Sequence, residues 1–279
     1  MLWQHGGMPG PDRHLGLLFD EVPELYDRVR PAYPEELFAD LAAISGIGEG
    51  SCVLEVGPGT GQATRPLAGL GCSVTAVEAG PGMAALARRN LAGLPGVEVE
   101  TARFEDWDDR ARMFDAVLAA SAWHWVDPAI GWARAHDLLR PQGWIVLLAN
   151  VVVRREGEPE VYAATADIHE RYSPGNPDWG HPPLEAEILA TDEGWGTVER
   201  AQPPGALFGP TTVRFYPHVK WFDGEGFADL LRSTSVYRRL GADIREPLLD
   251  AIAERVRTAM GDRAPRRYLS VLRAAQRSA

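Results

Sequence analysis

Three glycines at alternate positions follow directly on a short apolar segment of the chain. Residues 53–56 (VLEV) lead into Gly57, Gly59 and Gly61, and Glu55 precedes the first glycine by two positions. Glycine lets a backbone turn sharply and approach a ligand with no Cβ in the way. The pattern predicts a strand that ends in a ligand-binding loop.

The spacing of these glycines separates the candidate nucleotide ligands. A dinucleotide fingerprint needs a further glycine at position 62, where this chain has Gln62, and a P-loop ends in Gly-Lys-Ser/Thr, whereas no lysine lies nearby. A carboxylate at Glu55 would repel a diphosphate but would help to hold the ammonium group of a methionine moiety. We therefore expect the loop, including Thr60, to bind S-adenosylmethionine.

A second acid follows at a distance that suits a ribose. The apolar run 72–78 ends in Glu78, 21 positions after Gly57, which is the offset at which the second strand of a βαβ unit presents an acid to ribose hydroxyls. Residues 62–70 between the two runs predict a crossover helix. The turn 80–83 then starts another helix, and Met83 at its beginning is expected beside the cofactor.

The segments that position these residues alternate between strand and helix. Apolar strand-like runs without polar alternation predict a parallel sheet with helices on both faces, and a ligand then lies at the carboxyl ends of the strands. The expected strands are 52–56, 73–77, 97–101, 116–120 and 144–150, and the expected helices are 20–28, 34–44, 62–70, 83–91 and 128–139.

The end of the fourth strand carries the side chains that are most suggestive of substrate chemistry. Residues 120–125 (ASAWHW) contain Ser121, whose backbone is expected to face the methionine end of the cofactor. His124 between Trp123 and Trp125 would act as a general base or hydrogen-bond a substrate oxygen inside an aromatic wall. The alternative is that the tryptophans cap the core and His124 bonds to a backbone carbonyl.

From about residue 19 to residue 150 the chain resembles the class I S-adenosylmethionine-dependent methyltransferases. More narrowly, it is similar to the small-molecule group that includes trans-aconitate and quinone-ring methyltransferases. The matching segments are 25–34 (LYDRVRPAYP), 53–61 (VLEVGPGTG), 77–83 (VEAGPGM), 114–118 (FDAVL), 124–127 (HWVD) and 138–144 (LLRPQGW).

The resemblance implies a fold and further site residues. The fold would be α/β, a Rossmann-like seven-stranded sheet, mostly parallel with an antiparallel last strand, helices on both faces and an inserted cap. Phe104 would pack on the adenine, and Glu105 or Asp106 would face its amino group. The N-terminal helix would close the pocket with Tyr26, Arg30 and Tyr33, of which Arg30 would meet the methionine carboxylate or an anionic substrate and Tyr33 the substrate.

Beyond residue 150 the pattern becomes irregular. A proline-rich stretch with Tyr172, Trp179 and His181 predicts a substrate-covering cap over 151–192. We expect a disordered segment over 1–18, the cofactor-binding core over 19–150, and completion of the sheet with additional helices over 193–279. In that last part the expected strands are 197–201, 211–222 and 268–272, Pro217 marks 211–222 as an edge strand, and the expected helices are 227–240 and 244–260.

Composition limits the classes of function. The net charge of −11 argues against a nucleic-acid substrate, and no apolar run is long enough to span a bilayer, so we expect a cytoplasmic protein. Cys52 and Cys72 are expected as small core residues, and no metal site is predicted. The expected partners are a small-molecule substrate and a second copy of the chain in a homodimer, without nucleic acid or membrane.

The reaction expected from these features is direct displacement of the sulfonium methyl group by an oxygen, nitrogen or carbon atom of a small molecule. The preponderance of arginine over lysine hints at a bacterial secondary-metabolic role. Two alternatives stay open, a relative that binds S-adenosylmethionine without methylating and a nicotinamide-dependent oxidoreductase. A nucleic-acid or protein methyltransferase is disfavoured, since residues 121–124 (SAWH) stand where an Asn-Pro-Pro-Tyr-type motif would be expected.

Overall fold

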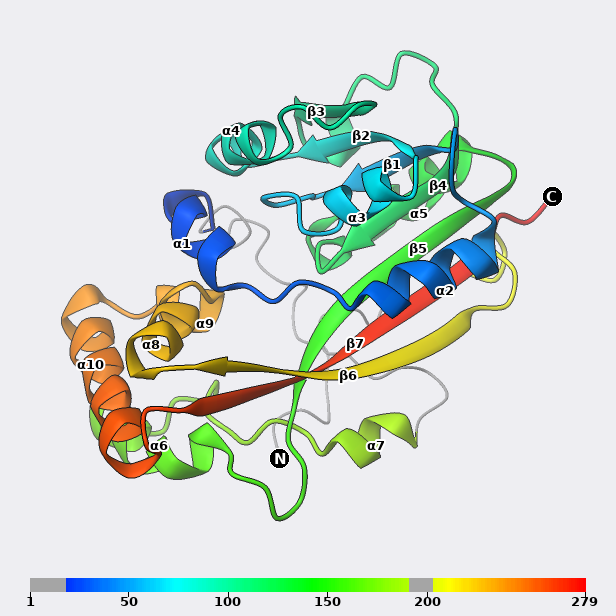
Figure 1. Cartoon of the computed structure of the whole chain (residues 1–279). Helices are drawn as coiled ribbons and strands as arrows, with labels where there is room; N and C mark the ends of the chain where they lie inside the picture. Colours follow the sequence, from blue (N-terminus) through cyan, green and yellow to red (C-terminus); the bar gives the residue numbers. More distant parts are fainter. Residues whose placement is uncertain (1–18, 191–202) are drawn as a thin grey trace.

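One seven-stranded sheet organises the described part of the chain (Figure 1). The computed structural model describes residues 19–190 and 203–279. The sheet order is β3-β2-β1-β4-β5-β7-β6. The strands are β1 Cys52–Val56, β2 Ser73–Glu78, β3 Val97–Thr101, β4 Phe114–Ala120, β5 Leu139–Val153, β6 Thr212–Phe222 and β7 Ala264–Gln276. Strands β1 to β5 pair in parallel, whereas β7 is antiparallel to both β5 and β6, which confirms the expected sheet.

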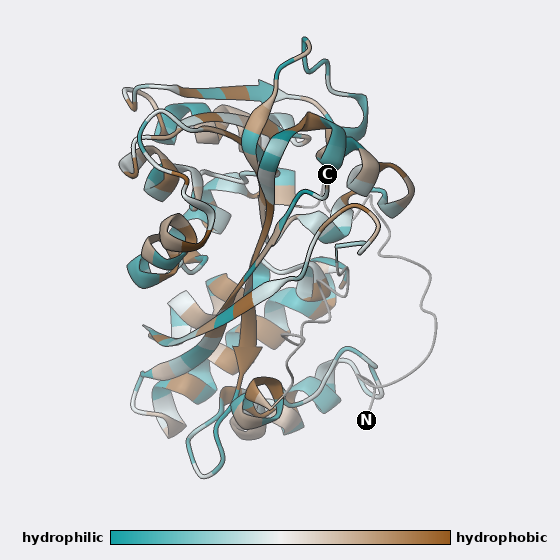
Figure 2. Ribbon diagram, turned by 90° about the vertical axis from the view of Figure 1, so that its right-hand side faces the viewer, coloured by the Kyte–Doolittle hydropathy of each residue, from teal (hydrophilic) through white to brown (hydrophobic). Residues whose placement is uncertain are grey.

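Helices cover both faces of the sheet because its strands are apolar on both sides. Leu37 and Leu41 of one helix pack with Val53 and Val74 on one face, and Trp132 packs near Leu54 on the other. The helices are α1 Pro23–Val29, α2 Glu35–Ser45, α3 Thr64–Gly69, α4 Pro81–Asn90, α5 Pro128–Leu138, α6 Val161–Tyr172, α7 Glu185–Leu189, α8 Gly224–Arg232, α9 Ser235–Arg238 and α10 Ala242–Ala259. The central strands are apolar over much of their length, and the loops are largely hydrophilic (Figure 2).

Three long strands carry the chain from the half that contains β1 to β4 to a separate layer of helices. Strands β5, β7 and β6 extend past the other four, and α6, α8 and α10 pack beside their far ends (Figure 1). This layer has its own apolar cluster, which includes Ile168, Phe227 and Leu249. Residues 151–153 belong to β5 and α6 packs on α10, so the expected cap begins inside the sheet and forms part of this layer.

At the carboxyl-terminal end, some of the expected strands and helices agree with the structure and others do not. Strand β6, which contains Pro217, is the outermost strand, so that position is an edge as expected. The helix expected over 227–240 is divided into α8 and α9. The strand expected over 197–201 and the segment 1–18 lie outside the described residues. Within the described residues, every helix is too short or too polar to traverse a lipid bilayer.

Candidate functional site

A cavity of about 540 Å³ opens at the carboxyl ends of β1, β2 and β4. The glycine loop and the end of β2 form one side of it. The segment that joins α1 to α2 covers it, and residues of β5, β7 and α8 close the far end. The cavity therefore lies where an open α/β sheet normally binds its ligand.

Two of the three glycines shape the wall of this cavity. Gly57 and Gly59 line it, and both have a left-handed backbone with φ of 67° and 60°. A Cβ at Gly57 would stand 2.6 Å from the Cβ of Ala122, so only glycine fits there. Gly61 lies outside the cavity, where a Cβ would meet the Leu91 side chain at 3.0 Å. Its role is to let the loop pack under α4.

Glu78 lies at the cavity wall as predicted. Its two carboxylate oxygens accept hydrogen bonds from the backbone N–H of Gly59 at 3.0 Å and of Gly80 at 2.9 Å. Burial raises the pKa of Glu78. Met83 also lines the cavity, and its N–H is bonded to Asp20 at 2.7 Å. Asp20 was not predicted, because only the fold brings it beside this turn.

Glu55 points away from the cavity, so its predicted contact with the methionine ammonium is wrong. The side chain is fully buried and accepts a hydrogen bond from Thr64 Oγ1 at 2.6 Å, on the face that α3 covers. Successive residues of a strand point to opposite faces. Glu55 and the lining residue Val56 therefore diverge. Burial raises the pKa of Glu55 to about 7, and its Oε1 has no hydrogen-bond partner among the described residues.

Thr60 is also outside the cavity, contrary to the prediction that it binds the cofactor. Its hydroxyl donates to Asp27 Oδ1 at 2.6 Å, and its carbonyl accepts a hydrogen bond from Asn90 Nδ2 at 3.1 Å. Thr60 therefore fastens the glycine loop to α1 and α4.

The segment after β3 forms another part of the cavity wall. Phe104 and Glu105 line the cavity, whereas Asp106 is exposed outside it. Glu105 Oε1 accepts a hydrogen bond from the N–H of Asp127 at 2.8 Å, which fixes the carboxylate. Of the two acids considered for the adenine amino group, the geometry therefore favours Glu105.

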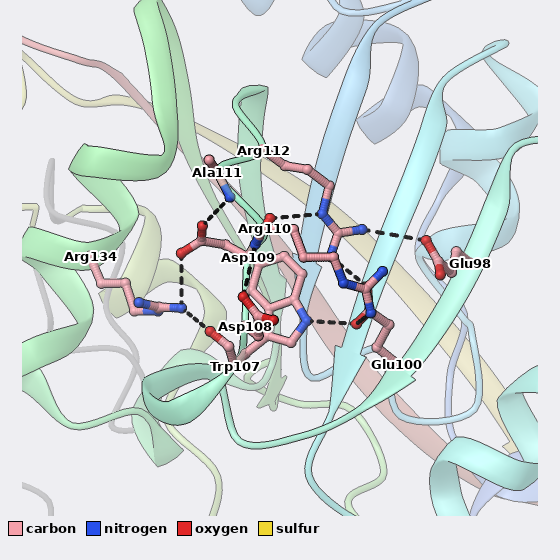
Figure 3. Close-up of polar contacts among 9 residues, drawn as sticks. All are labelled: Glu98, Glu100, Trp107, Asp108, Asp109, Arg110, Ala111, Arg112 and Arg134. Carbon is pink, nitrogen blue, oxygen red and sulfur yellow. Dashed lines mark hydrogen bonds and ion pairs between the residues drawn. The ribbon is translucent and has the colours of Figure 1, made fainter.

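Arg134 of α5 forms hydrogen bonds to this wall on the side away from the cavity. Sequence analysis did not identify Arg134. Its Nε donates to the carbonyl of Phe104 at 2.9 Å. Its guanidinium also contacts the carbonyl of Trp107 and, at 3.3 Å, Asp109 (Figure 3). Trp107 Nε1 in turn donates to Glu100 of β3 at 3.0 Å. These bonds fasten the wall to α5 and to the sheet.

The three residues Trp123 to Trp125 form a single 3₁₀ turn after β4, and their side chains separate. Trp125 lines the cavity as predicted. Trp123 lies in the core, with its ring centroid 4.7 Å from that of Trp132, so its substrate role is wrong. Three residues per turn direct consecutive side chains about 120° apart, which explains the divergence.

His124 is not among the residues that line the cavity. Its ring packs on Trp125 at a centroid distance of 4.3 Å, and Nδ1 is buried with no hydrogen-bond partner among the described residues. Burial lowers the pKa of His124 to about 4. His124 therefore lies outside the described cavity lining, and its assignment as the catalytic base stays a prediction.

The N-terminal residues close the cavity as expected. Tyr26, Arg30 and Tyr33 all line it. The Arg30 guanidinium lies 4.7 Å from the centroid of the Tyr26 ring, and one of its amino groups donates to the carbonyl of Ser233 at 3.0 Å. The Tyr33 hydroxyl is 2.9 Å from Ser121 Oγ, which also lines the cavity from a left-handed backbone position.

Helix α1 is fastened to both halves of the molecule. Asp27 bonds to the glycine loop, and Arg28 forms a 2.7 Å ion pair with Asp229 of α8. At the end of the helix, Lys220 Nζ of β6 donates to the carbonyl of Val29 at 2.9 Å. The helix therefore bridges the nucleotide-binding half and the helical layer across the cavity mouth.

Residues of β5, β7 and α8 form the far end of the cavity, and sequence analysis identified none of them. The register of the antiparallel pair places Asn150 opposite Ser270 and Val152 opposite Tyr268. The lining residues from these elements and the turn after α8 are Asn150, Val152, Leu230, Thr234, Arg266 and Tyr268. The one sequence feature that pointed to any of these residues was the position of Asn150 at the end of the apolar run 144–150.

The aromatic residues of the expected cap lie away from the cavity. The Trp179 ring is 4.7 Å from that of His169 and 5.2 Å from that of Tyr237, and its Nε1 donates to the carbonyl of Ser173. Tyr172 packs against the same helical cluster. Tyr172 and Trp179 are not among the described cavity-lining residues, because α6 packs on α10, and their substrate contacts stay predictions.

Comparison with known proteins points to one family. Residues 54–147 match a family model described as a methyltransferase domain. An uncharacterized methyltransferase of Mycobacterium tuberculosis is 36% identical over 145 residues, which are 52% of this chain and 57% of that protein. The match thus spans little more than half of that relative's length.

Two further matches extend over more of the chain. Methyltransferase nsrG of Aspergillus novofumigatus is 31% identical over 193 residues, which cover 62% of this chain and 72% of that protein. The solved structure of a putative type II methyltransferase from Anaeromyxobacter dehalogenans is 25% identical, with a TM-score of 0.58. The superposition covers 88% of this chain and 97% of that one.

Proposed function

Because the chain belongs to the class I S-adenosylmethionine-dependent methyltransferases, we propose that it transfers the cofactor's methyl group to a small molecule held at the far end of the cavity. The observation that carries this proposal is the continuity of the cavity. It runs from the glycine loop and Glu78, past Ser121, to Asn150 and Arg266. A donor and an acceptor can therefore meet inside one cavity.

The residues near the glycine loop suit the cofactor. Gly57 and Gly59 provide a wall without side chains, and Glu78 offers carboxylate lone pairs to the ribose hydroxyls. Phe104 and Met83 supply apolar surface for the adenine, and Glu105 accepts from its amino group.

Arg30 suits the methionine carboxylate. Its Nε is buried without a hydrogen-bond partner among the described residues, and it packs on Tyr26, whose ring lies close to Gly59. A buried guanidinium with a free donor favours an oxyanion ligand. In this arrangement Arg30 replaces Glu55 as the residue that orients the methionine end of the cofactor.

Methyl transfer requires mainly that the acceptor atom is positioned correctly. The bound cofactor supplies a methyl group on a positively charged sulfur, which is already an activated leaving group. The protein then has to hold the acceptor atom about 3 Å from that carbon, in line with the sulfur. Trp125 and Tyr33 line the walls between the two ends, and we expect them to confine the acceptor.

Two measurements test the proposal. Titration calorimetry with S-adenosylhomocysteine reports on cofactor binding. Incubation with labelled S-adenosylmethionine and a panel of small acceptors, read by mass spectrometry, reports on a product heavier by one methyl group. Binding with no transfer to any acceptor class would favour a non-methylating relative. Binding of NAD in place of S-adenosylhomocysteine would refute the proposal.

Several finer predictions belong with this function. We expect a small molecule as acceptor because the cavity, of about 540 Å³, has room for the cofactor and a small ligand only. Transfer to an oxygen, nitrogen or carbon atom stays a prediction, as do a role in secondary metabolism and a homodimer. We also propose that residues 19–150 form the cofactor-binding core, extended by β5 beyond that boundary.

A further inference from the structure

The two ends of the cavity differ in charge. Both lining carboxylates of the described residues, Glu78 and Glu105, belong to the end that suits the nucleoside. The far end carries Arg266 from β7, and Arg30 lies between the two ends. The far end is therefore cationic in a protein whose net charge is −11.

Arg266 differs from the arginines on either side of it in the sequence. Arg267 forms an ion pair with Glu158, and the exposed Arg263 stacks on Trp221 at 4.2 Å. For Arg266 no carboxylate partner occurs among the described residues, and its Nε is buried with no hydrogen bond there. Its guanidinium lies 5.8 Å from the Phe227 ring centroid. An unpaired cation in a partly buried site is costly unless an anion compensates it.

Asn150 of β5 lies opposite Ser270, four positions along β7 from Arg266, and adds a hydrogen-bond donor to the same end of the cavity. Its Oδ1 accepts a hydrogen bond from Ser270 and lies 3.4 Å from His218 Nε2. His218 Nε2 is itself 2.9 Å from Ser270 Oγ, so the three side chains fix the amide. With Oδ1 engaged on the strand side, Nδ2 is the amide atom that remains for the cavity.

Tyr268 completes the group. It lines the cavity, and its ring stacks on that of His218 with centroids 5.4 Å apart. Burial raises the pKa of Tyr268, while the nearby charges of Arg266 and Arg30 lower it. The hydroxyl stays protonated at neutral pH and can donate.

From this juxtaposition we propose that Arg266, Asn150 and Tyr268 form an oxyanion-binding subsite for the methyl acceptor. The acceptor class is then a small molecule with an anionic group, such as a carboxylate or phosphate. Guanidinium, amide and hydroxyl groups each donate hydrogen bonds to such an oxyanion. The inference rests on the proposed methyltransferase function and specifies its acceptor. His218 acts as a positioning residue, since it reaches the subsite through Asn150.

The test uses binding to the full chain saturated with S-adenosylhomocysteine. The probes are benzoate, phenyl phosphate and the neutral benzamide, which have the same ring and differ in charge. We expect at least one of the two anions to bind about tenfold or more tightly than benzamide, the range given by a charge-assisted bond. Whichever anion binds more tightly identifies the carboxylate or the phosphate as the preferred group.

Substitutions assign this preference to the subsite. Arg266→Gln should abolish it without changing the affinity for S-adenosylhomocysteine, and Arg266→Lys should keep part of it because the charge remains. Arg263→Gln removes an exposed arginine outside the cavity and is the matched control, with thermal unfolding measured for each variant. Equal binding of all three probes, or an anion preference that survives in Arg266→Gln, would overturn the subsite. Failure to bind S-adenosylhomocysteine would instead refute the proposed function.

Discussion

Replacement of Glu78 by alanine should weaken cofactor binding, and the structure gives the size of the effect. In the proposed complex each carboxylate oxygen keeps its backbone N–H, from Gly59 or Gly80, and can also accept from a ribose hydroxyl. A hydrogen bond to a charged group contributes about 1.5–3 kcal/mol. The dissociation constant of S-adenosylhomocysteine should therefore rise roughly 10- to 150-fold. Titration calorimetry measures this constant, and Asp106→Ala, an exposed acid outside the cavity, should leave it unchanged.

The same substitution also removes two acceptors from the loop, so stability and ligand contact must be separated. Each backbone N–H left unpaired costs about 1–3 kcal/mol where it is buried, which lowers the free energy of unfolding. A cofactor analogue that lacks one ribose hydroxyl distinguishes the two effects. The wild type should bind the analogue more weakly than the natural ligand, whereas Glu78→Ala should no longer discriminate. Discrimination that persists in the folded variant would refute the ribose contact.

Three further outcomes are expected. His124→Gln should retain wild-type turnover, and the pH profile of turnover should show no inflection from this residue near neutrality, since His124 lies outside the cavity and burial lowers its pKa to about 4; a large loss of turnover with unchanged stability would restore it as a catalytic candidate. Burial raises the pKa of Glu55 to about 7, so its contribution to stability is present below its unfolded pKa and is lost as pH rises through 7. Urea unfolding between pH 5 and 8 should show a decline of up to about 3 kcal/mol that Glu55→Gln flattens, and an equal slope in both proteins would contradict the shift. Arg134→Ala should weaken S-adenosylhomocysteine binding by loosening the Phe104 wall, by less than the roughly tenfold of one charged hydrogen bond because this bond is present in both the free and the bound protein, and unchanged affinity would show that the wall does not depend on Arg134.

Short sequence patterns predicted those residues of the cavity that lie close together in the chain. Gly57, Gly59 and Glu78 lie within a few residues of strand ends, and their hydrogen bonds run between neighbouring loops. The strand register of β1 with β2 follows from the apolar pattern of the two segments. These contacts need little information from the rest of the chain.

The far end of the cavity depends on contacts between distant segments. Asn150 and Arg266 are more than a hundred positions apart and line the same cavity because β7 returns antiparallel beside β5. Side-chain direction was the second source of error. Glu55 and Trp123 have the residue types of a site, but the strand pleat and the 3₁₀ turn direct them into the core. Composition and the spacing of residue types did not show toward which face these two side chains point.

The fastening of α1 to both halves of the molecule has a kinetic consequence. Ligands that occupy the cavity lie beneath a helix held by Asp27, by the Arg28–Asp229 ion pair and by Lys220, the chain's single lysine. We expect α1 to move when product leaves and fresh cofactor enters, which requires several of these bonds to break. Each turnover then includes an opening step whose rate is independent of the acceptor's reactivity. A highly reactive acceptor and a sluggish one would converge on the same maximal rate, set by the movement of α1.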